Sequence, residues 1–249
     1  MASTITDTRT LILLHAFPLG TRMWAPQRSA FPGWRVVTPA LPGFDDSHAT
    51  ASSMEAFATH VNQELDRLEI EAAVFGGLSL GGYVAFGVLR QRPERVSALI
   101  LADTRSGADS DQAREGRIRM LQVLEEHGPS GVFAEMCPKL FGATTHADRS
   151  AVVEQARGLA EAQAPAAIEG AIRAMLDRPD STPLLRTITV PTLIVVGEED
   201  ALTPPAESEG MQAAIPGAAL VRLPHAGHLS NLEAPEAFNA AVRAFLSTV

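Results

Sequence analysis

Apolar residues follow two patterns that alternate along the chain of 249 residues. Longer segments repeat apolar residues every three or four positions, which is the period of an amphipathic helix. Short, nearly continuous apolar runs between them are typical of strands buried on both faces of a parallel sheet. The alternation predicts an α/β fold with a doubly wound, mostly parallel sheet that carries helices on both faces. The predicted strands are 10–14, 35–38, 74–75, 96–102, 192–196 and 219–223.

Two of the predicted helices have recognisable N-terminal signals. Ser52 with Glu55 three residues later forms a capping box, followed by an apolar face made of Phe57, Val61, Leu65 and Leu68. Pro235 suits the first turn of the last helix, whose apolar positions are Phe238, Ala241, Val242, Phe245 and Leu246. Both helices are therefore expected to pack one face against the sheet.

One long stretch, from about residue 104 to 185, contains helical patterns but no strand pattern. A crossover between parallel strands needs only about a dozen residues, so the excess requires another explanation. It predicts a helical cap over the C-terminal edge of the sheet, where open α/β sheets bind ligands. The predicted domains are a core of residues 1–104 and 184–249 and an inserted cap of residues 105–183. Helices packed on the flank of the sheet are the alternative.

The first part of this insertion is the most polar. We expect the loop from residue 103 to 116 to be the most mobile connection in the chain. Three helices are expected in the insertion, because apolar residues recur there at helical spacing: one with Ile118, Leu121 and Leu124, one with Val152, Ala156 and Leu159, and one with Ile168, Ala171, Ile172, Met175 and Leu176.

The segment Gly77-Leu78-Ser79-Leu80-Gly81 lies between a predicted strand and an apolar helical segment. Glycine two positions before and after a serine suits a sharp strand-to-helix turn that holds the hydroxyl strained and exposed. A serine hydroxyl is a weak nucleophile at neutral pH, and it needs a base that is itself oriented by a carboxylate. We interpret Ser79 as a nucleophile, which requires a histidine and an acid elsewhere in the chain.

His228 is the favoured base among seven histidines. It follows the last predicted strand, and the preceding Gly227 lets the loop turn the imidazole over the sheet edge. His225 is the alternative base, and is otherwise a loop residue.

The acid should project from the end of another strand. Asp200 follows the strand at 192–196 and is favoured, with Asp103 at the end of the preceding strand as the alternative. Glu198 and Glu199 are expected to face solvent. The order Ser79, Asp200, His228 agrees with the order expected for a serine nucleophile in this architecture.

Two backbone N–H groups are needed to stabilise the tetrahedral intermediate. Leu80, the residue after the predicted nucleophile, is expected to supply one at a helix N-terminus, where the helix dipole adds to the effect. Phe17 is expected to supply the other from the loop after the first strand, since Pro18 has no N–H and Ala16 lies closer to the strand. His15 is expected to brace this loop by hydrogen bonding.

Composition excludes several other functions. The formal charge of −9, from 20 basic and 29 acidic residues, argues against a nucleic-acid partner or an anionic membrane surface. The single cysteine, Cys137, excludes an intrachain disulfide and is interpreted as a small apolar residue in a protein from a reducing compartment. His225 and His228 lack further ligands for zinc, so neither a metal nor a cofactor is expected.

No feature predicts export or membrane insertion. The N-terminus has no basic start followed by an apolar stretch. The 18-residue uncharged run at 72–89 contains five glycines, which suits a strand, a turn and a helix better than a membrane span. We expect a cytoplasmic protein.

Five motifs together resemble those of the α/β-hydrolase superfamily: H-A-F-P-L, L-P-G-F, G-L-S-L-G-G-Y, G-E-E-D-A-L-T-P and A-G-H-L-S-N-L-E-A-P-E-A-F. They occur in the family's order and cover nearly the whole chain, with the closest likeness to 3-oxoadipate enol-lactonase-like hydrolases and small carboxylesterases. The resemblance implies an α/β-hydrolase fold with Ser79 as nucleophile, Asp200 as acid and His228 as base. It also implies Phe17 and Leu80 as the oxyanion hole.

The chain departs from the family pattern in two places. Members often carry an aspartate and a second glycine around the L-P-G loop, where this chain has Ala40 and Asp45. Only about nine residues precede the first strand, so the antiparallel hairpin usual at this sheet edge is expected to be missing or reduced to one strand.

The sequence thus predicts a serine hydrolase of carboxylic esters with short to medium acyl chains, acting as a monomer or small homo-oligomer on a small-molecule ester or lactone. Lactones and enol-lactones are the alternative substrates, and perhydrolysis, amide hydrolysis or carbon–carbon cleavage use the same triad. A non-catalytic small-molecule receptor is the alternative from another class. The expected apolar pocket wall consists of Trp24, Met136, Leu140, Phe141 and Met175.

Overall fold

The computed structural model describes residues 9–249, and this range forms one six-stranded sheet. The strands lie in the order β2-β1-β3-β4-β5-β6, and every neighbouring pair is parallel. The predicted α/β fold is therefore confirmed, and each predicted strand run matches an observed strand. The bounds are β1 Thr10–Leu14, β2 Arg35–Val37, β3 Ala73–Leu78, β4 Val96–Ala102, β5 Thr192–Gly197 and β6 Ala219–Leu223.

The sheet is doubly wound, because the chain starts at β1, moves outward to β2 and then returns across β1 to β3. This reversal places helices on both faces. One face packs against α1 Met54–Arg67, α2 Leu80–Gln91, α7 Thr182–Leu185 and α8 Pro205–Ala214. The other packs against η1 Thr21–Trp24, α9 Ser230–Glu233 and α10 Pro235–Leu246, while η2 Pro93–Arg95 leads into β4.

Alternate strand residues supply the two hydrophobic cores, as the two-residue period of a strand requires. Ile12 and Phe75 lie in the core on the α2 side, whereas Leu11, Leu13 and Val74 lie in the core on the α10 side. The short strand β2 forms the edge beside β1, and residues 9–249 contain no antiparallel strand there. Any remaining hairpin strand within residues 1–8 lies outside the described residues.

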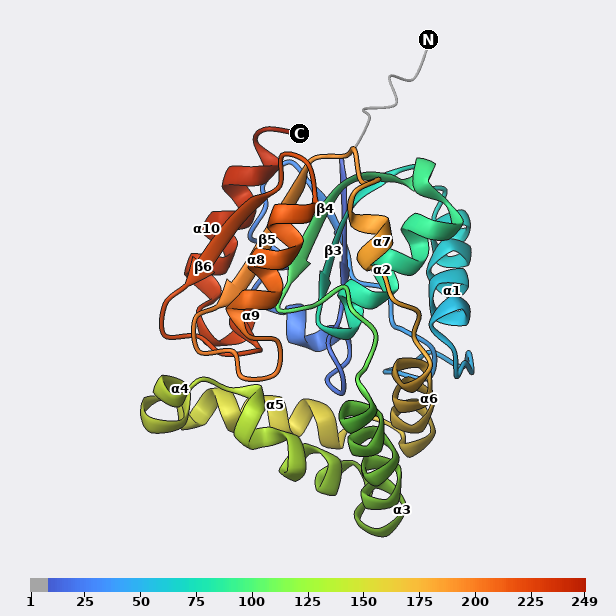
Figure 1. Cartoon of the computed structure of the whole chain (residues 1–249), viewed down its shortest axis with the longest axis vertical. Coiled ribbons are helices and arrows are strands. Elements are labelled where there is room, and N and C mark those ends of the chain that lie inside the picture. The colour runs from blue at the N-terminus through green and yellow to red at the C-terminus, as the bar shows by residue number, and fades with distance from the viewer. Residues whose placement is uncertain (1–8) are drawn as a thin grey trace.

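Four further helices form a separate layer beyond the carboxyl ends of the strands (Figure 1). We call them the helical layer: α3 Asp111–Leu140, α4 Ala143–Asp148, α5 Ser150–Glu161 and α6 Pro165–Leu176. The α3 helix changes direction at Gly128, whose φ of 64° and ψ of −164° are not helical, directly before Pro129. The chain enters this layer after β4 and leaves it before α7 and β5.

Two local predictions, the helix cap and the extent of the polar loop, were wrong. The cap of α1 is Ser53, whose Oγ accepts the N–H of Ala56 at 3.2 Å, because the helix starts one residue later than a box with Ser52 requires. The three helices predicted in the insertion are observed as α3, α5 and α6, although Ile118 on α3 is 51% exposed and Leu124 is the buried member of its group. The polar loop is also shorter than expected, because Ser110 caps a helix that begins at Asp111.

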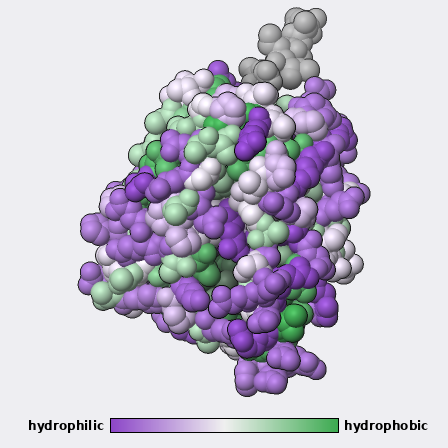
Figure 2. Space-filling view, viewed as in Figure 1, coloured by the Kyte–Doolittle hydropathy of each residue, from purple (hydrophilic) through white to green (hydrophobic). Residues whose placement is uncertain are grey.

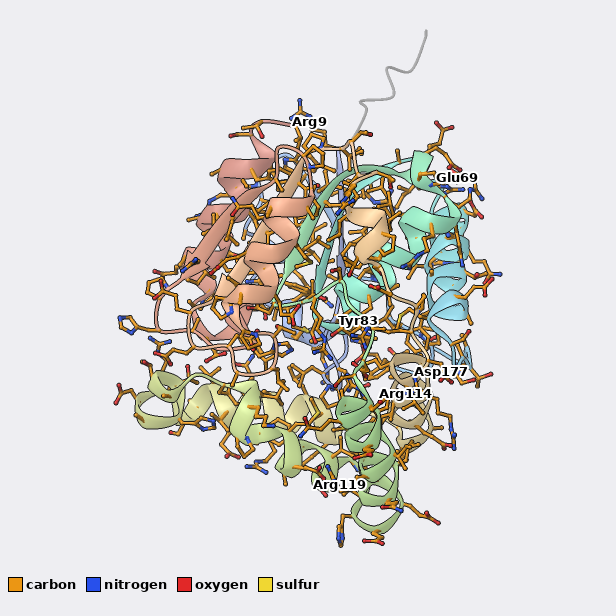
Figure 3. All side chains as sticks on the ribbon, viewed as in Figure 1. Arg9, Glu69, Tyr83, Arg114, Arg119 and Asp177 are labelled. Atoms are coloured by element: carbon orange, nitrogen blue, oxygen red, sulfur yellow. The ribbon has the colours of Figure 1, made fainter. Side chains whose placement is uncertain are left out.

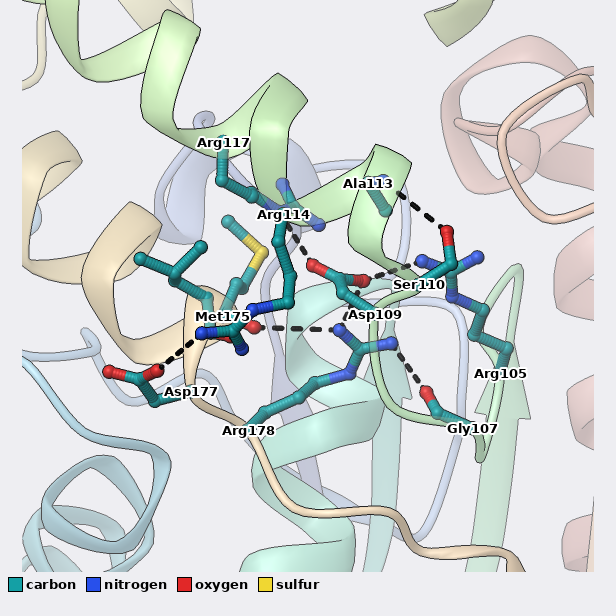
Figure 4. Close-up of polar contacts among 11 residues, drawn as sticks. Arg105, Gly107, Asp109, Ser110, Ala113, Arg114, Arg117, Met175, Asp177 and Arg178 are labelled. Carbon is teal, nitrogen blue, oxygen red and sulfur yellow. Dashed lines mark hydrogen bonds and ion pairs between the residues drawn. The ribbon is translucent and has the colours of Figure 1, made fainter.

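The two connections between sheet and helical layer meet at a buried carboxylate, that of Asp109 (Figure 4). It binds Arg105 at 2.6 Å, Arg117 at 3.1 Å and also Arg178. Burial opposes ionisation of Asp109, but the charges of Arg117 and Arg178 hold its pKa below the ordinary value. We call these four residues the Asp109 cluster. Arg105 and Asp109 come from the first connection, Arg178 from the second and Arg117 from α3.

The Asp109 cluster also contacts the core. The Arg178 guanidinium lies 4.2 Å from the ring centroid of Tyr83 on α2, and it donates to the carbonyl of Gly107. Tyr83 lies at the boundary between the sheet layer and the helical layer, and Arg114 and Asp177 lie near one another in the helical layer (Figure 3). Arg114 pairs with Asp177 at 3.2 Å, which joins α3 to the end of α6.

Candidate active site

Ser79 occupies a strained turn between β3 and α2. Its φ of 54° and ψ of −111° lie outside the regions that non-glycine residues favour. A Cβ at Gly77 would lie 2.3 Å from the backbone of Gly81, and a Cβ at Gly81 would lie 2.1 Å from the carbonyl oxygen of Leu14. The two flanking glycines are therefore required by close backbone approach, which is the reason predicted for them.

The strained turn is anchored to the neighbouring strand β4. The N–H of Ser79 donates to the carbonyl of Ala102 at 3.0 Å. The hydroxyl of Thr104 donates to the carbonyl of Ser79 at 2.9 Å. These bonds satisfy the backbone of Ser79 without using its side chain, so the hydroxyl stays available for chemistry.

His228 and Asp200 form a buried pair at the same edge of the sheet. Nδ1 of His228 lies 2.8 Å from Oδ2 of Asp200, and the two residues are 2% and 4% exposed. Asp200 follows β5 and His228 follows β6, so the carboxyl ends of two adjacent parallel strands bring them together. Asp200 and His228, each predicted from its own place in the sequence, thus lie in hydrogen-bonding contact.

The carboxylate of Asp200 is ionised in this environment. Burial disfavours its charge, but the charge and hydrogen bond of His228 and the bonds from Thr203 hold its pKa below the ordinary value. Oδ1 accepts the N–H groups of Leu202 and Thr203 at 2.8 and 2.9 Å, and Oδ2 accepts the Thr203 hydroxyl at 2.6 Å. An ionised acid beside Nδ1 favours the tautomer with the proton on Nδ1, which leaves Nε2 as an acceptor.

The alternative acid and the alternative base lie in other environments. Asp103 is completely buried; it accepts the N–H of Gly197 at 2.8 Å and the hydroxyl of Ser230. Burial and the nearby charge of Asp200 raise its pKa well above the ordinary value. His225 has a side chain that is 69% exposed and lies 3.9 Å from Glu199. Neither residue takes part in the Asp200–His228 contact.

The loop after β1 carries the predicted second N–H donor. Among the described residues, neither the N–H of Phe17 nor that of Leu80 donates a hydrogen bond. The preceding N–H, that of Ala16, donates to the thioether sulfur of Met23 at 3.1 Å. This sulfur contact, which no sequence pattern indicates, holds the backbone next to Phe17.

His15 braces the same loop, as expected from the sequence. Its Nδ1 lies 3.0 Å from the carbonyl of Ala16, and its Nε2 accepts the N–H of Leu41 at 3.3 Å. Burial lowers the pKa of His15 to about 4, so the ring is neutral at pH 7. Both ring nitrogens are used, which leaves His15 no part in proton transfer.

Asp45, the departure from the family's loop pattern, also holds backbone in place. Its carboxylate accepts the N–H of Thr21 at 2.7 Å, and its own N–H donates to Oε1 of Gln163 at 2.9 Å. Gln163 lies after α5 and donates in turn to the carbonyl of Leu19 at 3.2 Å. The loop after β1 is thereby joined to the helical layer.

The helical layer approaches the histidine loop closely. A Cβ at Gly227 would lie 2.1 Å from the N atom of Gly142, so the two backbones are in direct contact. Glu199 was expected to face solvent, and this was wrong: its carboxylate accepts the N–H and hydroxyl of Thr144 at 2.8 and 2.5 Å. These contacts bring the α3–α4 junction against the loops that carry Asp200 and His228.

The five residues expected in an apolar pocket wall fall into different parts of the core. Trp24, Leu140 and Phe141 belong to the core on the α10 side, and Trp24 packs 6.0 Å from the ring of Phe238. Met175 belongs to the other core, whereas the partly buried Met136 contacts both. Figure 2 shows a hollow with hydrophobic atoms in it where the helical layer meets the sheet layer.

Residues 9–249 contain no group of three or more His, Cys, Asp or Glu side chains placed to hold a metal ion. None of the helices in this range combines the length and apolar character needed to cross a membrane.

Comparisons with known proteins agree with this architecture. The chain is 28% identical over 238 residues to a pimeloyl-[acyl-carrier protein] methyl ester esterase of Aromatoleum aromaticum, covering 91% of this chain and 93% of that protein. It is 30% identical over 198 residues to 3-oxoadipate enol-lactonase 2 of Acinetobacter baylyi, covering 78% and 70%. A malate-bound thermophilic esterase from Thermogutta terrifontis has a TM-score of 0.93 at 38% identity, covering 96% of this chain and 90% of that one.

The family assignment rests on the length of the match as well as on these relatives. The model of the alpha/beta hydrolase family matches residues 11–241, which include all the strands except the first residue of β1. The chain therefore belongs to the alpha/beta hydrolase family.

Proposed function

We propose that the chain is a cofactor-free serine hydrolase that cleaves carboxylic esters through an acyl-enzyme. Ser79 is the nucleophile, His228 the base and Asp200 the acid. The buried contact of 2.8 Å between Nδ1 of His228 and Asp200 carries this proposal. It orients a histidine at the sheet edge where the strained Ser79 also lies.

The reaction follows from the positions of these groups. Nε2 of His228 takes the proton of Ser79 as Oγ attacks the ester carbonyl, and the resulting imidazolium is stabilised by Asp200. The N–H groups of Phe17 and Leu80 bind the oxyanion of the tetrahedral intermediate. His228 then returns the proton to the leaving alcohol, and a water molecule hydrolyses the acyl-enzyme by the same steps in reverse order.

We also propose that the helical layer acts as the cap of this site, with residues 105–183 as the inserted domain. Its position beyond the carboxyl ends of the strands supports this role (Figure 1). The boundary at 183/184 falls inside α7, whose residues Thr182–Leu185 pack with the core helices, so the structural break lies before α7.

The substrate class rests on the site's surroundings and on the relatives. An apolar hollow at the junction of the two layers favours esters with short to medium acyl chains over polyanionic substrates (Figure 2). Lactones and enol-lactones are the second candidates, favoured by the similarity to the enol-lactonase of Acinetobacter baylyi. We propose the cytoplasm as the compartment, since the chain has one cysteine and no disulfide.

The test replaces Ser79 with alanine, which removes only the hydroxyl. We expect Ser79→Ala to lose at least about three orders of magnitude in kcat on p-nitrophenyl esters, with an unchanged circular dichroism spectrum. A panel of acyl chain lengths, an enol-lactone and simple lactones measured on the wild type then distinguishes the substrate classes. Near-normal activity of the variant would refute the proposal. The proposal would also fail if a fluorophosphonate did not label the wild type at Ser79, which is the result expected of a non-catalytic receptor.

A further inference from the structure

One buried carboxylate outside the proposed triad contacts both the histidine loop and the helical layer. Glu233, the last residue of α9, is 4% exposed. Its Oε1 accepts the N–H of Leu229 at 3.1 Å, and its Oε2 accepts the N–H of Gly142 at 2.9 Å. Leu229 directly follows His228, and Gly142 directly precedes α4, so one side chain joins two parts of the site that are far apart in sequence.

The same junction is held at a second point by Arg149. Its Nη1 donates to the carbonyl of Glu233 at 2.8 Å and to the carbonyl of His225 at 3.0 Å. Arg149 follows α4, so the short helix is attached to the histidine loop before its first residue and after its last. Gly142, at the first of these attachments, also contacts the backbone of Gly227 directly.

A third attachment joins the helical layer to the side chain of Glu199 in the acid loop. Glu199, which precedes Asp200, accepts two hydrogen bonds from Thr144 on α4. The attachments through Glu233 and Glu199 therefore differ in one respect. The first ends on the backbone N–H next to the base. The second ends on the Glu199 side chain, and Glu199 reaches the histidine loop only at Ala226, whose carbonyl accepts its N–H at 2.8 Å, and at His225, 3.9 Å away.

We propose that Glu233 is a positioning residue. It holds the backbone next to His228 through the N–H of Leu229, and it holds the end of α3 at Phe141 through the N–H of Gly142. This inference rests on the proposed function. Because both bonds converge on one carboxylate, a shift of the layer at Gly142 is transmitted to the loop of the base. Displacements of about 1 Å in a catalytic group reduce rates by up to about a hundredfold, so the attachment supports turnover as well as selectivity.

The experiment compares Glu233→Gln with Thr144→Val on p-nitrophenyl esters of increasing chain length. A glutamine carbonyl can accept only one of the two N–H groups, and its NH2 faces the other donor. We expect Glu233→Gln to lower kcat by about 10- to 100-fold with KM changed by less than about threefold. The rate of Ser79 modification by a fluorophosphonate should fall in parallel, since that reaction also needs His228.

Thr144→Val is the matched control, because it removes a hydrogen bond from the third attachment at nearly constant volume. We expect its kcat on the preferred ester to stay within about twofold of wild type, while its preference among chain lengths broadens. Arg149→Met is a second variant at a partly exposed site, and we expect it to lower kcat by about 3- to 10-fold. It decides the question if Glu233→Gln does not fold, as judged by circular dichroism.

Each outcome bears on the inference. An active wild type with unchanged kcat in Glu233→Gln, or in Arg149→Met if the first variant is unfolded, would overturn the positioning role alone. Equal losses of kcat in Glu233→Gln and Thr144→Val would also overturn it, because the histidine loop would then have no special part. A wild type that neither hydrolyses esters nor reacts at Ser79 would instead refute the proposed function, and this inference with it.

Discussion

Replacing Asp200 with asparagine should stop the proposed reaction and leave the fold intact. The two oxygens of Asp200 have different partners. Oδ1 accepts two backbone N–H groups, from Leu202 and Thr203, and Oδ2 contacts the Thr203 hydroxyl and Nδ1 of His228. In Asp200→Asn the amide oxygen must face the two backbone donors, so the NH2 group takes the place of Oδ2.

This orientation inverts the hydrogen bond to the base. The amide NH2 donates to Nδ1 of His228, which places the ring proton on Nε2, and Nε2 then cannot accept the proton of Ser79. We expect kcat/KM to fall by about 10³- to 10⁴-fold, or about 4–5.5 kcal/mol of transition-state stabilisation. The Thr203 hydroxyl can turn to accept from the NH2, so every contact keeps a partner and the melting temperature should change little.

The matched control is Asp103→Asn. Burial raises the pKa of Asp103 well above its ordinary value, and an amide has the shape of the carboxylic acid that this shift favours. The amide oxygen can accept from Gly197 and the NH2 can donate to the Ser230 hydroxyl, so we expect activity within about threefold of wild type.

Both variants are measured by steady-state ester hydrolysis near pH 8 and by thermal melting. The reasoning fails if Asp200→Asn keeps more than about a tenth of wild-type kcat/KM. It also fails if Asp103→Asn loses as much activity as Asp200→Asn, because the acid would then belong to β4 and not to β5.

Three further predictions concern other buried groups. Met23→Leu leaves the N–H of Ala16 without an acceptor beside Phe17, so kcat should fall about tenfold at constant KM in the ester assay; an unchanged kcat would contradict this. The folded His15 has a pKa of about 4, whereas the unfolded histidine has the ordinary pKa of about 6.5. As the pH falls from 6.5 to 4 the imidazole is protonated only in the unfolded state, so up to about 3 kcal/mol of the stability present above pH 6.5 is lost. In urea unfolding at pH 7 and 4.5, His15→Asn should lose less stability than wild type on acidification, and an equal loss would refute the assignment. Arg178→Met removes one of three arginine partners of the buried Asp109. It should lower the free energy of unfolding by about 1–3 kcal/mol in urea at pH 7, whereas no change would show that Arg105 and Arg117 are sufficient.

The sequence predicts the sheet well because its signals are local. Each strand is a short apolar run, and the run at 96–102 coincides with β4 from end to end. The glycines around Ser79 and the loops that carry Asp200 and His228 are likewise recognisable from their own neighbourhood. Parallel strands then place these loops at one edge, so the pairing of acid with base follows from the topology.

Contacts between distant segments could not be predicted in the same way. Glu199 has the sequence context of a solvated loop, and only the position of α4 gives its carboxylate a partner in Thr144. Asp109 lies in a polar stretch that predicts an exposed loop, but arginines 4, 8 and 69 residues away surround it. The helix cap is Ser53 and not Ser52, which the sequence could not predict because neighbouring serines offer the same capping chemistry.

The Asp109 cluster bears on how the chain reaches its fold. β4 ends at Ala102 and β5 begins at Thr192, so the pairing of these neighbours must close a long loop, at an entropic cost that grows with loop length. The bond between Arg178 and Asp109 joins residues 69 positions apart and leaves only short segments between itself and the two strands. Insertions or deletions between these two residues therefore leave the final closure of β4 on β5 unchanged, and helices of other lengths can be exchanged there during evolution without altering the sheet.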